Sequence, residues 1–248
     1  MIEVRHLRKS FGKNLILDDV SLRVERGESV VIIGRSGGGK SVLLKHIVGL
    51  LLPDEGDVLI DNENMRGMNE RELIRVRQKF GMLFQGAALF DSMTVAENVA
   101  FALRRQRKFT EAEINNKVAE ALDMVELSGT ETKNPSELSG GMRKRVGLAR
   151  AIVYEPQIVL YDEPTTGLDP VVSDSIDHLI MRVRDQLKIT SLVVTHDMRS
   201  ARRVGQRIIM LYNKKIYFSG TPEQVFSSTD PVIYNFVNGI SKPQEHHL

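Results

Sequence analysis

Cysteine is absent from the 248-residue sequence. Its absence excludes disulfide bonds, thiol nucleophiles and cysteine metal ligands. An excess of charge of either sign is also missing, since 34 Lys and Arg against 32 Asp and Glu leave a net charge of +2. That balance argues against a nucleic-acid partner held by bulk electrostatic attraction. The basic clusters at 143–145 and at Arg199 with 202–203 are typical of solvated helix faces.

Long apolar runs are missing as well. The longest candidate, residues 47–52, is broken by Gly49 and stopped by Pro53, whereas a membrane-spanning helix needs about 18 to 20 apolar residues. Residues 1–5 alternate like a β-strand and lack the basic and then apolar order of a secretory signal. We therefore expect a cytoplasmic chain that does not itself cross a membrane.

The hydrophobic pattern of the first half predicts strands interrupted by a few helices. Alternation in residues 2–28, with a turn at 11–14, is typical of antiparallel strands. Further on, the pattern predicts buried strands at 30–33, 58–60 and 80–84, a turn at 53–56 and a helix over 70–79.

Strands and helices alternate beyond Pro156. The pattern predicts strands at 158–161, 191–194 and 208–211, and helices at 171–187 and 198–204. Such alternation is typical of a parallel sheet with right-handed helical crossovers. The intervening residues, 94–155, are expected to be helical throughout. There Thr110 and Glu113 offer a capping box, and Gly129 offers a helix terminator.

These patterns predict an α/β fold with a mostly parallel sheet, an N-terminal antiparallel β-subdomain and an inserted helical subdomain. We expect one domain over residues 1–240, whose core comprises 1–95 and 156–230 and whose helical subdomain comprises 96–155. Residues 241–248 are expected to form a short, polar, disordered tail.

A glycine-rich loop, residues 34–41, follows the buried strand 30–33 and precedes a helical pattern. In such a loop successive N–H groups point at an anion, and the helix start adds its positive dipole end. Lys40 then reaches the β- and γ-phosphates of a nucleotide, and the Ser41 hydroxyl coordinates Mg²⁺. The candidate nucleotide-binding residues are Gly34, Arg35, Ser36, Gly37, Gly38, Gly39, Lys40, Ser41 and Val42. The loop alone does not decide among kinases, GTPases, motors and transport ATPases.

Two consecutive carboxylates, Asp162 and Glu163, follow the strand at 158–161. This is the sheet edge at which α/β proteins place ligands. Neighbouring residues on a strand point to opposite sides, so the two can take separate roles. We expect Asp162 to hold Mg²⁺ and Glu163 to polarise a water for attack on the γ-phosphate.

The run from Leu138 to Arg145, followed by residues 148–151, resembles the signature helix of ABC-type ATPases. Ser139, Gly140 and Gly141 open that helix, whose bare N–H groups and dipole can cradle a phosphate. The resemblance extends over residues 1–225, with every motif in the order of the family. Two positions depart from the pattern: Met142 replaces the commoner glutamine, and Val42 stands where threonine is frequent.

The resemblance implies roles for four further residues. Gln85 matches the glutamine that touches Mg²⁺ and the attacking water and senses the membrane partner, and His196 matches the switch histidine at the γ-phosphate. Asp169 matches the aspartate that crosses between subunits. Phe11 lies where the family places an aromatic ring on adenine, although Phe11 could equally belong to the core. Asp197, beside His196, could also cap the following helix.

The resemblance further implies an ATPase with the ABC fold that uses ATP and Mg²⁺. Two copies would pair head to tail, each ATP lying between Lys40 of one copy and residues 139–141 of the other. The pair would dock on a separate integral membrane permease at the cytoplasmic side of the inner membrane.

Residues 82–95 and 236–240 look closest to ATPases of the Mla type, which drive phospholipid trafficking with MCE-domain lipid-binding proteins and an accessory cytoplasmic subunit. Two alternatives stay open. One is the ATPase of a polar amino-acid importer, and the other is a non-transport ABC ATPase that regulates a membrane partner.

Overall fold

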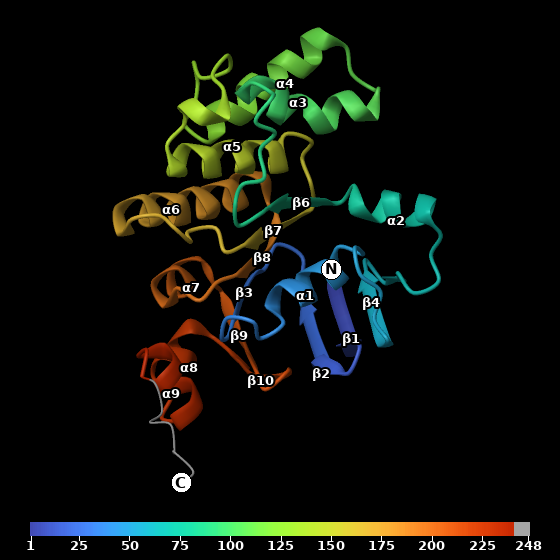
Figure 1. Cartoon of the computed structure of the whole chain (residues 1–248), viewed down its shortest axis with the longest axis vertical. Helices are drawn as coiled ribbons and strands as arrows, with labels where there is room; N and C mark the ends of the chain where they lie inside the picture. The colour runs from blue at the N-terminus through green and yellow to red at the C-terminus, as the bar shows by residue number, and fades with distance from the viewer. Residues whose placement is uncertain (241–248) are drawn as a thin grey trace.

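The computed structural model describes residues 1–240 (Figure 1). The expected tail at 241–248 lies outside the described residues. The N-terminal strands form a four-stranded sheet in the order β2-β1-β4-β5 with antiparallel pairing. Its strands are β1 (Ile2–Phe11), β2 (Asn14–Val24), β4 (Glu55–Ile60) and β5 (Glu63–Asn64). The predicted antiparallel subdomain is therefore confirmed, including the turn that joins Phe11 to Asn14.

A second sheet of six strands has the order β10-β9-β3-β8-β7-β6. Its strands are β3 (Ser29–Ile33), β6 (Phe80–Leu83), β7 (Ile158–Asp162), β8 (Thr190–Val194), β9 (Arg207–Tyr212) and β10 (Lys215–Gly220). All neighbours pair in parallel except β10, which pairs antiparallel with β9. The central strands are apolar on both faces because helices or strands cover both faces.

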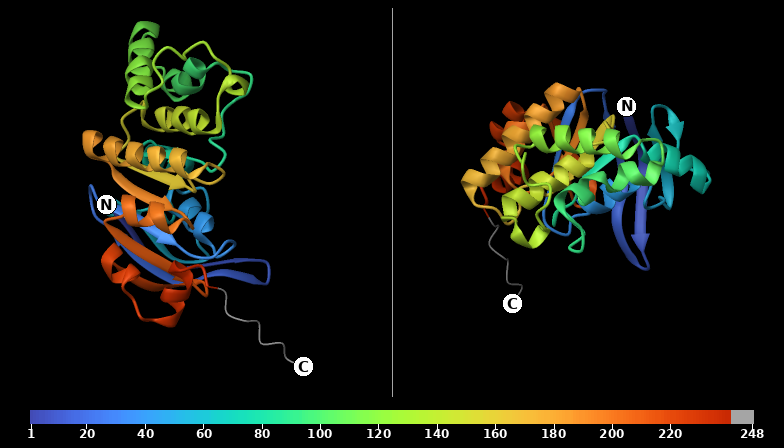
Figure 2. Two further views of the ribbon diagram at one scale, coloured as in Figure 1. Left: turned by 90° about the vertical axis from the view of Figure 1, so that its left-hand side faces the viewer. Right: turned by 90° about the horizontal axis from the view of Figure 1, so that it is seen from above.

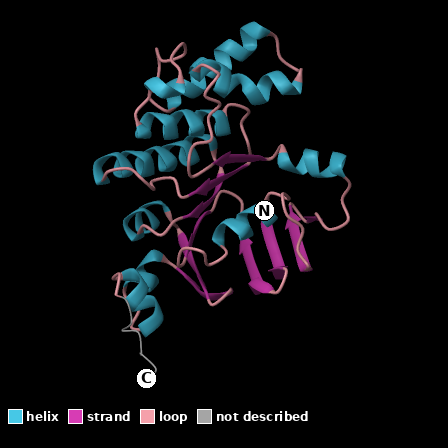
Figure 3. Ribbon diagram, viewed as in Figure 1, coloured by secondary structure: helices cyan, strands magenta, loops and turns pink. Residues whose placement is uncertain are grey.

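The two faces of this sheet contribute to different cores. Val31 and Ile33 of β3 pack with one cluster and Val30 and Ile32 with the other, as expected when side chains alternate across a strand. One core contains α1 (Lys40–Ile47) and the antiparallel sheet, and the other contains α6 (Pro170–Leu187), α7 (Met198–Val204) and the helical insertion. Figure 3 shows the two groups of strands with helices on either side.

The helical insertion forms a separate layer beyond α6 (Figures 1 and 2). It comprises α3 (Val95–Gln106), α4 (Glu111–Met124), the short 3₁₀ helix η1 (Pro135–Glu137) and α5 (Gly140–Ile152). The capping box of Thr110 and Glu113 is present at the start of α4. The remaining helices are α2 (Glu70–Arg77), α8 (Pro222–Phe226) and α9 (Pro231–Val237).

The expectation that residues 94–155 are helical throughout is wrong. Helix α4 ends at Met124, and residues 125–139 are loop apart from η1. The chain takes left-handed backbone at Glu126 (φ 59°) and Gly129 (φ 82°), and a helix cannot continue through either. The sequence patterns also missed β10, α8 and α9. Within residues 1–240, no helix is both long and apolar enough to cross a membrane.

Candidate functional site

The glycine-rich loop connects β3 to α1, as predicted. Its glycines are needed for space as much as for flexibility. A Cβ on Gly34 would lie 2.4 Å from the carbonyl oxygen of Leu211, and a Cβ on Gly38 would lie 2.9 Å from that of Arg35. Gly39, the residue before α1, has φ 95°, which favours glycine. The loop therefore holds its backbone N–H groups at the start of α1 in a conformation that other residues would disrupt.

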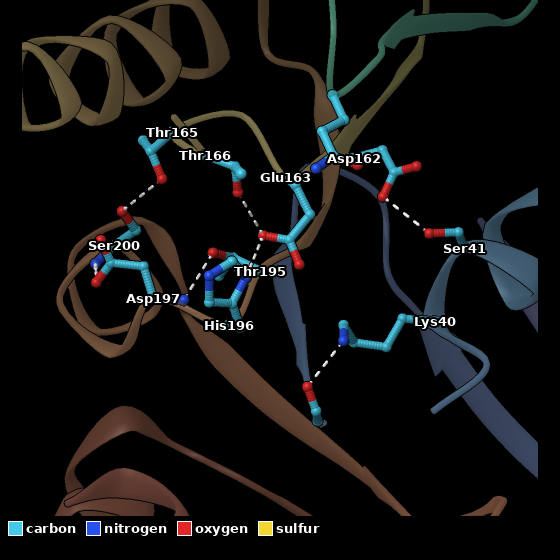
Figure 4. A network of polar contacts seen from close by, with 12 residues as sticks. Lys40, Ser41, Asp162, Glu163, Thr165, Thr166, Thr195, His196, Asp197 and Ser200 are labelled. Carbon is cyan, nitrogen blue, oxygen red and sulfur yellow. Dashed lines mark hydrogen bonds and ion pairs between the residues drawn. The ribbon is translucent and has the colours of Figure 1, made fainter. Parts of the chain in front are cut away.

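Lys40 is buried, and its ammonium folds back over the loop. The Nζ donates to the carbonyl oxygens of Gly34 at 2.8 Å and Arg35 at 3.0 Å (Figure 4). Burial lowers the pKa of Lys40, while the carboxylates of Glu163 and Asp162 oppose that shift. Since an ammonium has three N–H donors, one donor is left for a further acceptor beside the loop.

Ser41 and Asp162 bring two oxygen atoms together across the site. The Ser41 Oγ donates to Asp162 Oδ1 at 3.1 Å, although the two residues are 121 positions apart. Burial raises the pKa of Asp162, and the hydrogen bond from Ser41 partly offsets this. A hydroxyl and a carboxylate are hard oxygen donors of the kind that Mg²⁺ prefers, so the two side chains fit the expected metal.

Glu163 follows β7 and is held from several directions. Its backbone N–H donates to the Val194 carbonyl at 2.9 Å, and its φ of 50° is unusual for a residue with a side chain. The Oε2 atom accepts from the Thr166 hydroxyl at 3.1 Å and lies 2.8 Å from His196 Nδ1 (Figure 4). The surroundings thus impose one orientation on this carboxylate.

A cleft of about 310 Å³ lies over these groups and contains most of the expected site. It is lined by Phe11, Ile16, Ser36, Gly37, Gly38, Gly39, Lys40, Ser41, Val42, Gln85, Glu163 and His196. Phe11 is 49% exposed, which rules out the alternative that it belongs to the core. Sequence reasoning missed Ile16, which comes from β2 and reaches the cleft only because the antiparallel sheet lies beside the loop.

The signature residues do not line this cleft. Ser139 caps α5 by accepting from the Met142 N–H at 3.2 Å, and its side chain is exposed. Asp169 caps α6 by accepting from the Val171 and Val172 N–H groups at 3.0 Å. Gly140 and Gly141 open α5, and a Cβ on Gly141 would lie 2.6 Å from Val172 Cγ1. One chain therefore presents the phosphate loop and the signature helix as two separate surfaces.

The expectation that residues 143–145 form a solvated helix face is wrong for two of the three. Lys144 is only 5% exposed and donates to the backbone carbonyls of Gln85 and Glu163. Arg145 donates to the Val125 carbonyl at 2.8 Å and to Ser175 Oγ at 2.7 Å. Both cations donate to backbone carbonyls that are distant in sequence, a role that a basic run in a sequence does not indicate.

Asp197 caps α7, as predicted, by accepting from the N–H groups of Arg199 and Ser200. It thereby fixes the start of the helix that follows His196. The two neighbouring parallel strands, β7 and β8, deliver Glu163 and His196 to the same sheet edge. The site thus combines a glycine-rich loop, a buried lysine and a positioned carboxylate, an arrangement found in P-loop ATPases.

The family model described as ABC transporter matches residues 17–166, and this chain belongs to that family as an ABC transporter ATPase. The chain is 47% identical over 238 residues to the probable ribonucleotide transport ATP-binding protein mkl of Mycobacterium leprae, covering 96% of this chain and 69% of that protein. It is 39% identical over 241 residues to the intermembrane phospholipid transport system ATP-binding protein MlaF of Haemophilus influenzae, covering 97% of this chain and 91% of that protein.

The fold also matches a solved ATP-binding cassette, a dimer in a post-hydrolysis state bound to ADP and Pi. The TM-score is 0.82 at 34% identity, covering 90% of this chain and 99% of that one. The predicted fold, ATPase class and nucleotide are confirmed by these matches. Dimeric assembly is shown for that relative.

Proposed function

We propose that this chain is the ATPase subunit of a phospholipid transporter and drives a separate membrane permease from its cytoplasmic side. The observation that carries the lipid assignment is the match to MlaF, a relative named for intermembrane phospholipid transport, over nearly the full length of both chains. The relative named for ribonucleotide transport is more similar in sequence but extends well beyond the matched region. We expect an MCE-domain lipid-binding protein and an accessory cytoplasmic subunit in the same complex.

The cleft supports a specific division of labour in ATP hydrolysis. The loop N–H groups and Lys40 bind the phosphates, and Phe11, exposed at the rim, stacks on the adenine. Ser41, Asp162 and Gln85 would hold Mg²⁺, which supplies positive charge to the β- and γ-phosphates. Glu163 accepts the proton of the attacking water, and His196 orients Glu163 and contacts the γ-phosphate.

The separation of Ser139 from the cleft supports the head-to-tail pair. Helix α5 begins at the exposed residue Ser139, outside the cleft of its own chain. The start of a helix suits a phosphate, and here that phosphate would come from a second copy. In the pair, Ser139, Gly140 and Gly141 of one copy close over the ATP held by Lys40 of the other, and Asp169 crosses the interface. ATP then favours the closed pair, and hydrolysis releases it.

A groove beside the Gln85 loop is suited to the permease. It has a volume of about 450 Å³ and is lined by Met93, Glu97, Phe101, Arg104, Arg105 and Arg107. Phe84 and Phe90, on the same loop as Gln85, are exposed at 39% and 41%. Met93 and Phe101 give the groove apolar contacts, and its three arginines outnumber the single carboxylate of Glu97. Such a groove fits a short amphipathic helix that carries acidic residues.

Purification of the native complex through a tag on this chain tests the proposal. Mass spectrometry should find a multispan permease, a lipid-binding protein and enriched phospholipid. A permease that co-purifies with a solute-binding protein and without lipid would favour an amino-acid importer. A partner that lacks any pathway for lipid or solute would favour a regulator. Phe101→Glu places a charge in the groove. This variant should no longer co-purify with the permease, while its ATP binding should be unchanged.

A further inference from the structure

Helix α5 presents one face to the loop that carries Gln85. Lys144, Gly147 and Arg150 are spaced three residues apart and therefore share a side of the helix. All three contact the segment from Leu83 to Ala88. The helix that begins with the signature residues thus also holds the loop that we expect to face the permease.

Lys144 is the central contact on this face. Its ammonium donates to the backbone carbonyl of Gln85 and, at 3.1 Å, to that of Glu163. The side chain is 5% exposed and forms no ion pair within residues 1–240. Burial lowers the pKa of Lys144, and the nearby carboxylates of Glu163 and Asp162 oppose that shift. A buried cation with two backbone acceptors fixes both of them in space.

Gly147 and Arg150 hold the rest of the same loop. A Cβ on Gly147 would lie 2.8 Å from Leu83 Cδ1, so the helix and the loop are in close contact. The guanidinium of Arg150 donates to the carbonyls of Ala87 at 2.6 Å and Ala88 at 2.7 Å. Both alanines have left-handed backbone, with φ of 59° and 49°. Such conformations persist when surrounding contacts impose them.

The same ammonium also contacts Glu163, which lines the cleft. Glu163 also has left-handed backbone, and its N–H and side chain are held by Val194, Thr166 and His196. Its carbonyl accepts from the Lys144 ammonium at 3.1 Å and, more distantly, from the Thr166 N–H at 3.4 Å. Lys144 is therefore the contact by which α5 holds the backbone from which the Glu163 carboxylate extends.

We propose that Lys144 is a positioning residue for ATP hydrolysis, whose ammonium ties Gln85 and Glu163 to the signature helix. This inference rests on the roles proposed above for those two residues. In the proposed pair, the start of α5 closes over the ATP of the partner, while Lys144 orients the catalytic groups of its own site. Helix α5 then links the two ATP sites through a single rigid element.

Steady-state ATP hydrolysis by the full chain tests the role. Lys144→Met keeps the length of the side chain and removes the ammonium. We expect kcat to fall about 10- to 100-fold and the KM for ATP to change by less than about threefold, because the phosphate loop is unaffected. Lys144→Arg, which restores a cation with several donors, should recover most of kcat. Lys117→Met, on the surface of α4, is the matched control and should behave as the original chain.

A spin label reports the loop directly, and the absence of cysteine makes it specific. Gly86→Cys is suitable because a Cβ at Gly86 has no atom within 4 Å. The label at position 86 should become more mobile in Lys144→Met and remain unchanged in Lys117→Met. If Lys144→Met does not fold, Lys144→Gln, whose amide can serve one carbonyl, is measured against the same criteria.

Unchanged kcat in Lys144→Met would overturn the inference, as would a parallel loss of kcat and ATP affinity that Lys144→Arg does not rescue. Glu163→Gln distinguishes a failure of the proposed role of Lys144 from a failure of the proposed catalytic role of Glu163. If Glu163→Gln abolishes turnover and Lys144→Met does not change it, only the role of Lys144 fails. If both variants hydrolyse ATP normally, the catalytic assignment itself fails. Neither result depends on which lipid or solute the transporter carries.

Discussion

His196 Nδ1 lies 2.8 Å from Glu163 Oε2, and the two residues follow neighbouring parallel strands of the central sheet. The carboxylate side chain is 12% exposed, whereas the imidazole is 60% exposed. The histidine therefore touches the carboxylate on one side and open space on the other. This arrangement suits a residue that orients the base and also contacts a phosphate that enters the cleft.

Replacing Glu163 by glutamine should separate ATP binding from hydrolysis. The amide keeps the shape of the side chain but cannot accept the proton of the attacking water, so we expect kcat to fall about 100-fold or more. ATP binding should persist, and size-exclusion chromatography with ATP should show a stabilised pair. Turnover near the original rate in this variant would remove Glu163 from the catalytic role.

Replacing His196 by alanine tests the histidine independently. Because the loop and Lys40 still bind the phosphates, we expect ATP affinity to change little while kcat falls about 10- to 100-fold. Nucleotide titration and steady-state kinetics measure the two effects. Thr166→Val, which removes only the other hydrogen bond to Glu163 Oε2, should lower kcat by a smaller factor than His196→Ala does. A larger loss in Thr166→Val than in His196→Ala would contradict the account.

Gly141 should tolerate a side chain only if Val172, which packs against it, is replaced by a smaller residue. The Cβ of Gly141→Ala would lie 2.6 Å from Val172 Cγ1 and 4.0 Å from Val172 Cβ. We expect Gly141→Ala to lower the thermal midpoint and ATPase activity, and the double variant with Val172→Ala to recover the midpoint. A double variant no more stable than Gly141→Ala would show that packing against α6 does not explain the glycine.

Asp177 should make stability depend on pH. Its carboxylate is 2% exposed and accepts from Ser200 Oγ at 2.8 Å, while Oδ1 has no partner among the described residues. Burial raises the pKa of Asp177 to about 6. The hydrogen bond from Ser200 and the charge of Arg203 oppose this shift, and the charges of Asp197 and Asp174 add to it. The folded chain therefore binds this proton more tightly than the unfolded chain does.

The stability contributed by that proton is present below about pH 4 and is lost as the pH rises through about 6. Asp177→Asn should thus be more stable than the original chain at pH 7.5, by about 2 to 3 kcal/mol, and nearly equal to it at pH 4. Urea unfolding at the two pH values measures the difference. Asp91→Asn, at an exposed position where the carboxylate forms no ion pair or hydrogen bond within residues 1–240, is the control, and its stability relative to the original chain should change little between the two pH values.

The sequence sufficed for the site residues that lie next to a strand end. Asp162 ends β7, Glu163 and His196 come just after β7 and β8, and Lys40 follows β3 through the glycine-rich loop. Parallel strands bring these ends to one edge of the sheet. Phe11 could not be decided from the sequence, because an aromatic at a strand end has the same pattern whether it is buried or exposed. The structure shows that Phe11 is exposed, because the antiparallel sheet places it at the cleft beside the glycine-rich loop.

The sequence did not predict which side chains donate to distant backbone carbonyls. Lys144 lies in a basic run that is typical of a solvated helix face, yet its partners are the carbonyls of Gln85 and Glu163, distant in sequence. The loop at 125–139 was missed for a related reason, since Glu126 carries no sign that it adopts left-handed backbone. Both depend on tertiary packing that local propensity does not describe.

The division of the ATP site between two copies can be tested by mixing two inactive variants. Lys40→Ala disables the phosphate loop, and Ser139→Arg blocks the signature helix, so each variant alone should lack ATPase activity. In a mixed pair one site carries both defects and the other carries none. We predict that mixing restores about a quarter of the original rate, since half of the random pairs are mixed and each keeps one of its two sites. If mixing restores no activity although mixed pairs form, the ATP site is not shared between copies.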